Sequence, residues 1–143
     1  MERKILFIVN VEAAVYKDDK WLLIRRSLKE DHAPGTYAMV SGKVENVTNE
    51  RDVLENAVKR EVLEEVGIEV DVEKYVCSNC FTSDKGNTVV DIIFLCKHAS
   101  GEAQPLDPDE VSAVEWMTKD EIENNTDIPP WVQNGFKAAF SAK

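Results

Sequence analysis

The stretch Arg60-Glu61-Val62-Leu63-Glu64-Glu65-Val66-Gly67-Ile68 carries the clearest pattern in the chain. Together with the residues before it, it predicts a helix from Asn49 to Val66, since apolar residues recur at intervals of three and four. Asn49 or Thr48 can cap the first turn, and Gly67 ends the helix in the C′ position. The recurring apolar residues are Leu54, Ala57, Val58, Val62 and Val66.

Three carboxylates of this stretch share one face of the predicted helix. Glu61, Glu64 and Glu65 are spaced i, i+3 and i+4, and like charges at these spacings repel one another. A hard divalent cation such as Mg²⁺ or Mn²⁺ relieves that repulsion, because it takes oxygen ligands. The alternative is an ordinary solvated acidic face on which Arg60 pairs with Glu64.

Strand patterns lie on both sides of the helix. Lys4 to Tyr16 and Trp21 to Arg26 are rich in apolar and β-branched residues around a polar turn, which predicts a β-hairpin. Ile68 to Val76 alternates apolar and acidic residues, as a half-buried strand does. Further strands are expected at 36–40, around Phe81, at 89–96 and at 111–117.

The C-terminal part predicts helices. Thr118-Lys119-Asp120-Glu121 has the spacing of a capping box, and Pro129-Pro130 suits the first turn of a last helix. The apolar stripe expected on that helix comprises Trp131, Val132, Phe136, Ala139 and Phe140. Strands, one long helix, more strands and closing helices predict an α+β fold with α/β/α layers.

The composition limits the classes of protein to consider. With 143 residues, 43% hydrophobic and 31% charged, the chain fits one globular domain over residues 1–143. Its net charge of −10 repels the backbone of duplex nucleic acid and anionic lipids. No apolar run approaches the roughly 20 residues that span a bilayer.

The chain start and the cysteines bear on localisation. Met1-Glu2-Arg3-Lys4 precedes an apolar run, but that run ends at Asn10-Val11-Glu12 without a cleavage pattern, so no signal peptide is expected. Three cysteines, an odd count, favour a reduced, cytoplasmic protein.

Gly42 followed by Arg60 to Ile68 resembles the Nudix box, whose family pattern is G-x5-E-x7-R-E-U-x-E-E-x-G-U with U an aliphatic residue. The last nine positions match in full. Residues 35–45, 21–26 and 115–121 also look like the strands and strand-to-helix passage of that family. The resemblance implies a Nudix-like α/β/α sandwich with a central mixed sheet, a long box helix and a C-terminal helix.

The resemblance also implies an activity. Nudix enzymes use Mg²⁺ or Mn²⁺ and water to hydrolyse a nucleoside diphosphate linked to another group X, by attack on a phosphorus. Carried over to this chain, Glu64 and Glu65 are the main metal ligands with the Gly42 carbonyl, and Glu61 is a further ligand or a base. Arg60 orients the carboxylates through a salt bridge, with Asp52 as one suggested partner.

The chain departs from the family pattern upstream of Arg60. Asp52 stands where the family has Glu, and nine residues separate it from Gly42 in place of five, a four-residue insertion. Val40-Ser41-Gly42 replaces the common Pro-Gly-Gly. The sequence leaves the loop geometry, and its effect on activity, open.

Two further residues enter from outside the box. Glu110 lies six residues before Trp116, a spacing like that of MutT-type members, which makes it a candidate base or fourth ligand. Its alternative is a solvated loop acid beside Asp107 and Asp109. Arg26, at a strand end, is a candidate contact for a substrate phosphate, and its alternative is an exposed charge.

Several alternatives remain. Cys77 and Cys80, with Cys96-x-His98, have zinc-ligand spacing, although ordinary thiols are favoured. A Nudix-fold module that binds nucleotides without hydrolysing them is the second functional hypothesis. The X group and a homodimer stay open, and four aromatic residues suit either base stacking or the core: Trp21, Tyr37, Phe81 and Trp131.

Overall fold

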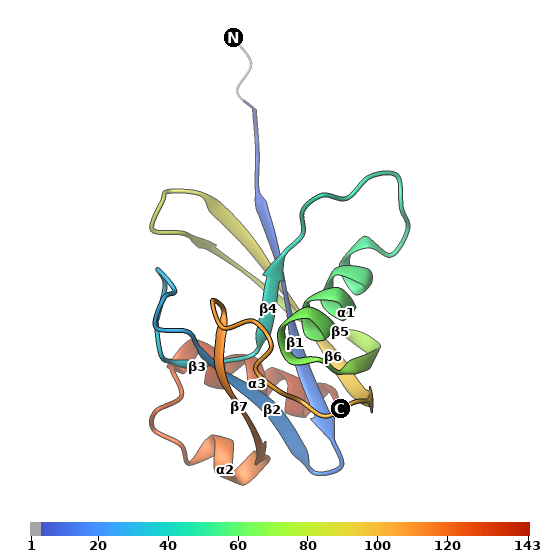
Figure 1. Cartoon of the computed structure of the whole chain (residues 1–143). Coiled ribbons are helices and arrows are strands. Elements are labelled where there is room, and N and C mark those ends of the chain that lie inside the picture. Colours follow the sequence, from blue (N-terminus) through green and yellow to red (C-terminus); the bar gives the residue numbers. More distant parts are fainter. Residues whose placement is uncertain (1–3) are drawn as a thin grey trace.

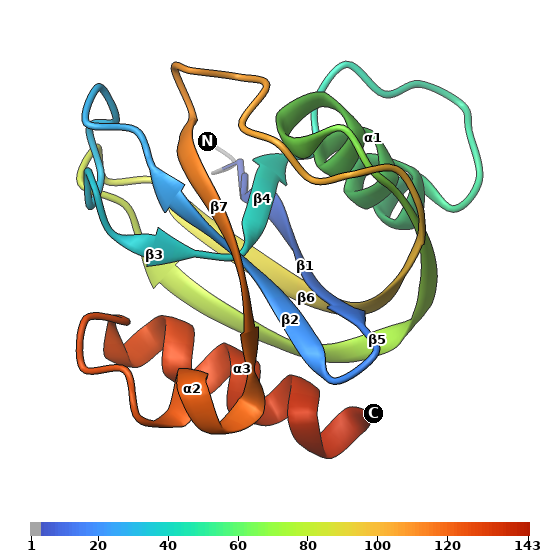
Figure 2. The same ribbon diagram turned by 60° about the horizontal axis from the view of Figure 1, so that its bottom comes forward.

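The computed structural model describes residues 4–143. Met1–Arg3, from which no signal peptide was expected to begin, lie outside the described residues. A sheet is covered on one face by helix α1 (Val53–Val66) and on the other by α2 (Lys119–Glu123) and α3 (Pro130–Ala142), as Figure 2 shows. The predicted α/β/α layers are confirmed.

The sheet has seven strands and is mixed, as predicted. β1 and β6 are parallel, and the other neighbouring pairs are antiparallel. The order is β3-β2-β1-β6-β5, with β4 also paired to β1 and β7 to β2 (Figure 1). The strands are β1 (Ile8–Lys17), β2 (Lys20–Arg26), β3 (Tyr37–Ala38), β4 (Val40–Lys43), β5 (Glu69–Thr82), β6 (Thr88–Ser100) and β7 (Val111–Thr118).

The predicted first hairpin is present, but its two strands separate soon after the turn. Tyr16 pairs with Trp21 and Lys17 with Lys20, and the two strands then take different partners. β1 continues along β4, while β2 continues along β7. The separation places Gly42, on β4, against the box helix and leaves Arg26 at the far end of β2.

Two hydrophobic cores hold the layers together. Val58, Val62 and Val66 of α1 are fully buried against one face of the sheet, as their spacing predicted. Val132, Phe136 and Ala139 of α3 pack on the other face. The prediction that Trp131 belongs to the buried apolar stripe of α3 is wrong, because this residue lies in the first turn of the helix and is 60% exposed.

Helix α1 begins later than predicted. Val53 is its first residue, and Asp52 precedes it in the left-handed conformation without a capping hydrogen bond from its side chain. Thr48 and Asn49, the predicted caps, lie in the exposed loop that contains the insertion. The predicted end is confirmed, because Gly67 is left-handed and its N–H donates to the Leu63 carbonyl at 3.0 Å.

Two other boundaries are informative. The strands expected at 68–76 and around Phe81 form one strand, β5, which lies at the edge of the sheet. The capping box at Thr118 is confirmed, with reciprocal hydrogen bonds to Glu121. No helix within residues 4–143 is long and apolar enough to cross a membrane.

Candidate active site

The three box carboxylates differ sharply in exposure. Glu65 is 4% exposed, Glu61 is half-buried and Glu64 is exposed to solvent. The helix therefore turns the same acidic face partly into the protein and partly outward. Figure 1 shows α1 beside the sheet, with a long loop leading from the end of β4 to the start of α1.

Glu65 is the most perturbed of these groups. Its Oε2 atom is buried and has no hydrogen-bond partner among residues 4–143. Burial, followed by the nearby charges of Glu61, Glu110 and Asp107, raises the pKa of Glu65 to about 9. A buried carboxylate oxygen without a partner is costly, so this position is suited to a bound cation.

Gly42 is required by the position of Glu61. A Cβ atom added at residue 42 would overlap the Glu61 carboxyl group, so only glycine leaves room for that side chain. Burial, followed by the charge of Glu64, raises the pKa of Glu61. The structure therefore brings Gly42 and Glu61 together.

Arg60 has a different partner from those suggested. Its Nη2 atom lies 3.5 Å from Glu61 Oε1. Within residues 4–143 its ion pair is with Glu61 and not with Asp52 or Glu64. Asp52 stands at the start of α1, two turns before Arg60, and Glu64 points to solvent. Arg60 thus restrains the half-buried carboxylate.

The loop before β7 is fastened to the end of α1 (Figure 2). The Gln104 N–H donates to the Val66 carbonyl at 2.9 Å, and the Leu106 N–H donates to the Glu65 carbonyl at 3.0 Å. These bonds satisfy carbonyls that a helix end otherwise leaves without partners. As a result, Asp107 is brought close enough to act on the charge of Glu65.

Glu110 joins the site through this loop. The Ser27 N–H donates to its backbone carbonyl at 2.9 Å, which fixes it beside the end of β2. A hydrogen-bonding contact with Glu30, followed by burial, raises the pKa of Glu110 to about 7. Glu110 is itself exposed to solvent, and its charge contributes to the raised pKa of Glu65.

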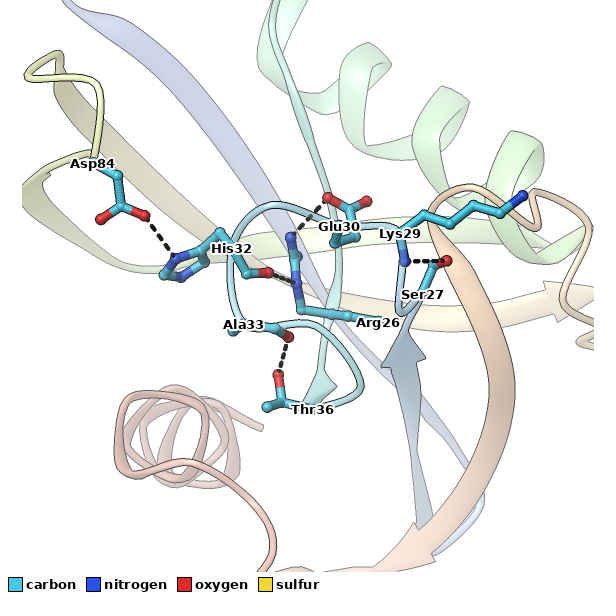
Figure 3. A network of polar contacts seen from close by, with 8 residues as sticks. All are labelled: Arg26, Ser27, Lys29, Glu30, His32, Ala33, Thr36 and Asp84. Carbon is cyan, nitrogen blue, oxygen red and sulfur yellow. Dashed lines mark hydrogen bonds and ion pairs between the residues drawn. The ribbon is translucent and has the colours of Figure 1, made fainter.

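Arg26 is held inside the following loop, as Figure 3 shows. Its Nε donates to the His32 carbonyl at 2.9 Å, and its Nη2 lies 3.2 Å from Glu30 Oε2. The Arg26 side chain is 20% exposed, so the alternative of an exposed strand-end charge is wrong. Its positive charge opposes the raised pKa values of both Glu65 and Glu110.

Sequence reasoning missed Glu30 and a second acidic pair. Glu12 and Asp91 lie on neighbouring strands, and burial, followed by the hydrogen bond with Asp91, raises the pKa of Glu12 well above its usual range. Asn10 Nδ2 donates to Asp91 Oδ1 at 2.6 Å. Glu12 lies within the apolar run of β1, and this position could have indicated from the sequence that its carboxyl group has a buried partner.

The cysteines do not form the zinc site considered as an alternative. All three, which lie within the described chain, are free thiols. Cys77 and Cys80 are three residues apart in the regular part of β5, so their side chains point to opposite faces. Of the aromatic candidates, Trp21 and Tyr37 are core residues, while Phe81 and Trp131 are exposed.

The donor set fits a divalent cation, although its side chains are spread apart. Across residues 4–143, no three acidic, histidine or cysteine side chains form a group that could hold an ion as they stand. The unpartnered oxygen of Glu65 and the all-oxygen character of the box face match the ligand preference of Mg²⁺.

Comparison with known proteins supports the resemblance to the Nudix family. A family model described as NUDIX domain matches residues 6–138. A MutT NUDIX hydrolase from Burkholderia pseudomallei is 25% identical, with 93% of this chain and 98% of that chain covered and a TM-score of 0.76. No curated protein matches the chain.

Two other solved structures share the fold. A MutT protein from Methanosarcina mazei Go1 is 23% identical, with 95% of this chain and 94% of that chain covered and a TM-score of 0.78. The solution structure of the E. coli ORF135 protein is 28% identical, with 96% and 93% covered and a TM-score of 0.67.

Proposed function

The chain belongs to the Nudix family, and we propose that it is a Mg²⁺-dependent pyrophosphohydrolase that cleaves a nucleoside diphosphate linked to another group X. One observation carries the proposal. The box helix holds Glu65, beside the half-buried Glu61, with a buried carboxylate oxygen that has no partner in the part of the chain that the structure describes. We place this activity in one cytoplasmic domain over residues 1–143.

The metal site comprises four residues of the box. Glu64 and Glu65, with the Gly42 carbonyl, hold Mg²⁺ or Mn²⁺, and Glu61 is a further ligand. The ion, when bound, supplies the positive charge that the phosphate oxygens of the substrate need. Gly42 leaves room for the Glu61 carboxyl group, and the ion pair with Arg60 limits its rotation.

Glu110 is the proposed general base. A base works best when its pKa is near the working pH, and that of Glu110 is raised to about 7. The loop that carries it is fastened to α1 through the Leu106 N–H, which keeps it beside the box face. Glu110 would take the proton of the attacking water.

Arg26 is the proposed contact for a substrate phosphate. It is a cation whose charge acts on both Glu65 and Glu110, which puts it near the acidic residues of the site. Its Nε and Nη2 atoms already have partners in the loop. The guanidinium N–H groups not used there would bind the phosphate.

A Nudix-fold module that binds nucleotides without hydrolysing them is the second hypothesis. The four-residue insertion and Asp52 favour it, because both change the loop between Gly42 and α1. The intact carboxylates favour the enzyme. A module without catalysis has no need to keep the repulsion among Glu61, Glu64 and Glu65.

Product release from a substrate panel tests the proposal. The panel comprises nucleoside triphosphates, nucleotide sugars, ADP-ribose and dinucleotide polyphosphates, each with Mg²⁺ or Mn²⁺, with products separated by chromatography. Glu64→Gln is expected to abolish turnover in a folded protein. Glu55→Gln, on the same helix and about 180° away from Glu64, is expected to keep it.

The outcomes separate the two hypotheses. Turnover of one substrate class that Glu64→Gln loses and Glu55→Gln keeps would support the enzyme and identify its X group. Turnover retained by Glu64→Gln would contradict the role of that residue. An inactive wild-type protein across the panel, with both metals, would favour the binding module.

A further inference from the structure

Trp131 is a large aromatic residue that the fold leaves exposed on a fixed backbone. It lies in the first turn of α3 and is 60% exposed. Pro129 and Pro130 come directly before it, and a proline fixes its own backbone torsion. The Val132 and Gln133 N–H groups both donate to the Pro129 carbonyl, at 3.0 and 2.9 Å. The backbone at Trp131 is therefore held in place, while much of the residue faces solvent.

His32 lies beside Trp131 but comes from another segment, the loop between β2 and β3. The two ring centroids are 6.4 Å apart, and the ring planes are inclined by 41°. The His32 side chain is 65% exposed, and its Nδ1 atom lies 4.0 Å from Asp84 Oδ2 in the turn between β5 and β6 (Figure 3). Three separate segments therefore meet around two largely exposed aromatic rings.

The spacing of these two rings suits a flat ligand between them. Carbon atoms in contact are about 3.5 to 4.0 Å apart, so two parallel rings need a separation of about 7 Å to hold a third ring. The separation of 6.4 Å is close to that value, and rotation of the exposed His32 side chain can reduce the tilt. A tilted pair at this distance can also pack directly, but direct packing buries surface, and both residues are largely exposed.

A hydrogen bond connects His32 to the proposed phosphate contact. The Arg26 Nε atom donates to the His32 carbonyl at 2.9 Å. The loop that contains His32 is closed at its base, because the Arg26 N–H donates to the Thr36 carbonyl at 2.8 Å and the Gly35 N–H donates to the Arg26 carbonyl at 2.9 Å. In a nucleotide one sugar separates the base from the first phosphate. A nucleotide whose phosphate binds Arg26 therefore brings its base within reach of the rings of His32 and Trp131.

We propose that His32 and Trp131 hold the base of the nucleotide substrate by stacking on its two faces. The inference rests on the proposed function, since it takes Arg26 as the phosphate contact. Stacking accepts any base, because every base has two flat faces, and it strengthens with the area of the rings in contact. The two residues therefore favour purine nucleotides over pyrimidine nucleotides and contribute nothing to the binding of an inorganic polyphosphate.

Calorimetry and tryptophan fluorescence measure this binding, with Ca²⁺ in place of Mg²⁺ as the cation that binds oxygen ligands. ATP and ADP-ribose are the purine probes, CTP is the pyrimidine probe, and inorganic tripolyphosphate has no base. ATP and ADP-ribose should quench the fluorescence of Trp131, whereas tripolyphosphate should not, and ATP should bind more tightly than CTP. Trp131→Ala should weaken ATP binding about tenfold, as the loss of one stacked base does, and change tripolyphosphate binding by no more than about twofold.

Two further variants separate the ring from the fold. Trp131→Phe keeps an aromatic ring and removes the fluorescent group, so it should bind ATP within about threefold of the wild-type affinity but without quenching. His32→Ala keeps the carbonyl to which Arg26 donates and removes only the second ring. It should therefore weaken the binding of ATP and leave that of tripolyphosphate unchanged.

Tyr75→Ala is the matched control. Tyr75 is 56% exposed, but its ring packs edge-on against Phe94, which belongs to the core on the α1 face of the sheet. Trp131 belongs to α3, which covers the opposite face. The affinities of Tyr75→Ala for ATP and tripolyphosphate should both stay within about twofold of the wild type.

Three results would overturn the inference. The first is an equal loss of ATP and tripolyphosphate affinity in Trp131→Ala, because the residue would then support the fold and not the base. The second is wild-type ATP affinity in both Trp131→Ala and His32→Ala, and the third is a wild-type fluorescence that no nucleotide changes. Turnover of the substrate panel alongside any of these results would leave the proposed function intact. Quenching by ATP in a protein that hydrolyses nothing would contradict the proposed function but support the stacking.

Discussion

Replacing Glu65 with glutamine should stabilise the metal-free protein more and more as the pH rises. The folded protein holds the Glu65 carboxyl with a pKa of about 9, against an ordinary value of 4.5. Between these values the folded state keeps a proton that the unfolded state releases, so the stability of the wild type falls as pH rises. Glutamine does not titrate and removes this loss.

The size of the effect follows from the same shift. Each pH unit in which only the unfolded carboxyl is ionised costs about 1.4 kcal/mol. The gap between the variant and the wild type should therefore widen by about 2 to 3 kcal/mol from pH 5 to pH 7. Glu65 is 4% exposed, so solvent screens this effect little.

The groups around Glu65 determine the shift. Glu61 on the same helix, with Asp107 and Glu110 from the loop before β7, raise its pKa, and Arg26 from β2 lowers it. Because these groups are present in both the wild type and Glu65→Gln, the difference in unfolding free energy between the two proteins reports on residue 65 alone.

Urea unfolding in the presence of a chelator, at several pH values, measures the gap. A gap that does not change between pH 5 and pH 7 would show that the folded protein does not hold Glu65 protonated in this range. Adding Mg²⁺ at pH 8 should then stabilise the wild type more than the variant, because the ion uses the ionised carboxylate.

Two further predictions concern the site. Gly42→Ala should displace the Glu61 carboxyl group and weaken Mn²⁺ binding and turnover at least tenfold. The free energy of unfolding should change by less than about 1 kcal/mol, because the backbone at residue 42 is not left-handed and an alanine causes no strain there. Unchanged turnover in this variant would contradict the overlap between a Cβ atom at residue 42 and the Glu61 carboxyl group. The value of kcat/KM should fall about tenfold for each pH unit below pH 7, because protonated Glu110 cannot accept a proton. A kcat/KM value that stays constant down to pH 5.5 would argue against Glu110 as the base.

The sequence was sufficient for the framework of the site. Periodic valines placed α1 against the sheet, and the spacing of three carboxylates placed them on one face of that helix. These are local patterns, so a short window contains all the information. The end of α1 was predictable for the same reason, since Gly67 adopts the left-handed conformation that its residue type permits.

The parts that were missed depend on contacts between distant segments. Glu30 and Glu110 are eighty positions apart, and the hydrogen bond from the Ser27 N–H to the Glu110 carbonyl joins the two loops that carry them. The start of α1 was predicted too early, because the exposed insertion takes an irregular path in which Asn46 and Asp52 are left-handed. The charge of Asp107 beside Glu65 likewise depends on the loop that Leu106 fastens to the helix.

Binding of Mn²⁺ to the protein without substrate, measured by electron paramagnetic resonance, tests whether the acidic face of α1 holds the metal ion. The wild type and Glu55→Gln should bind Mn²⁺ with equal affinity, while Glu64→Gln and Glu65→Gln should each bind it at least tenfold more weakly. Equal Mn²⁺ affinity in all four proteins would show that the acidic face of α1 is not the metal site.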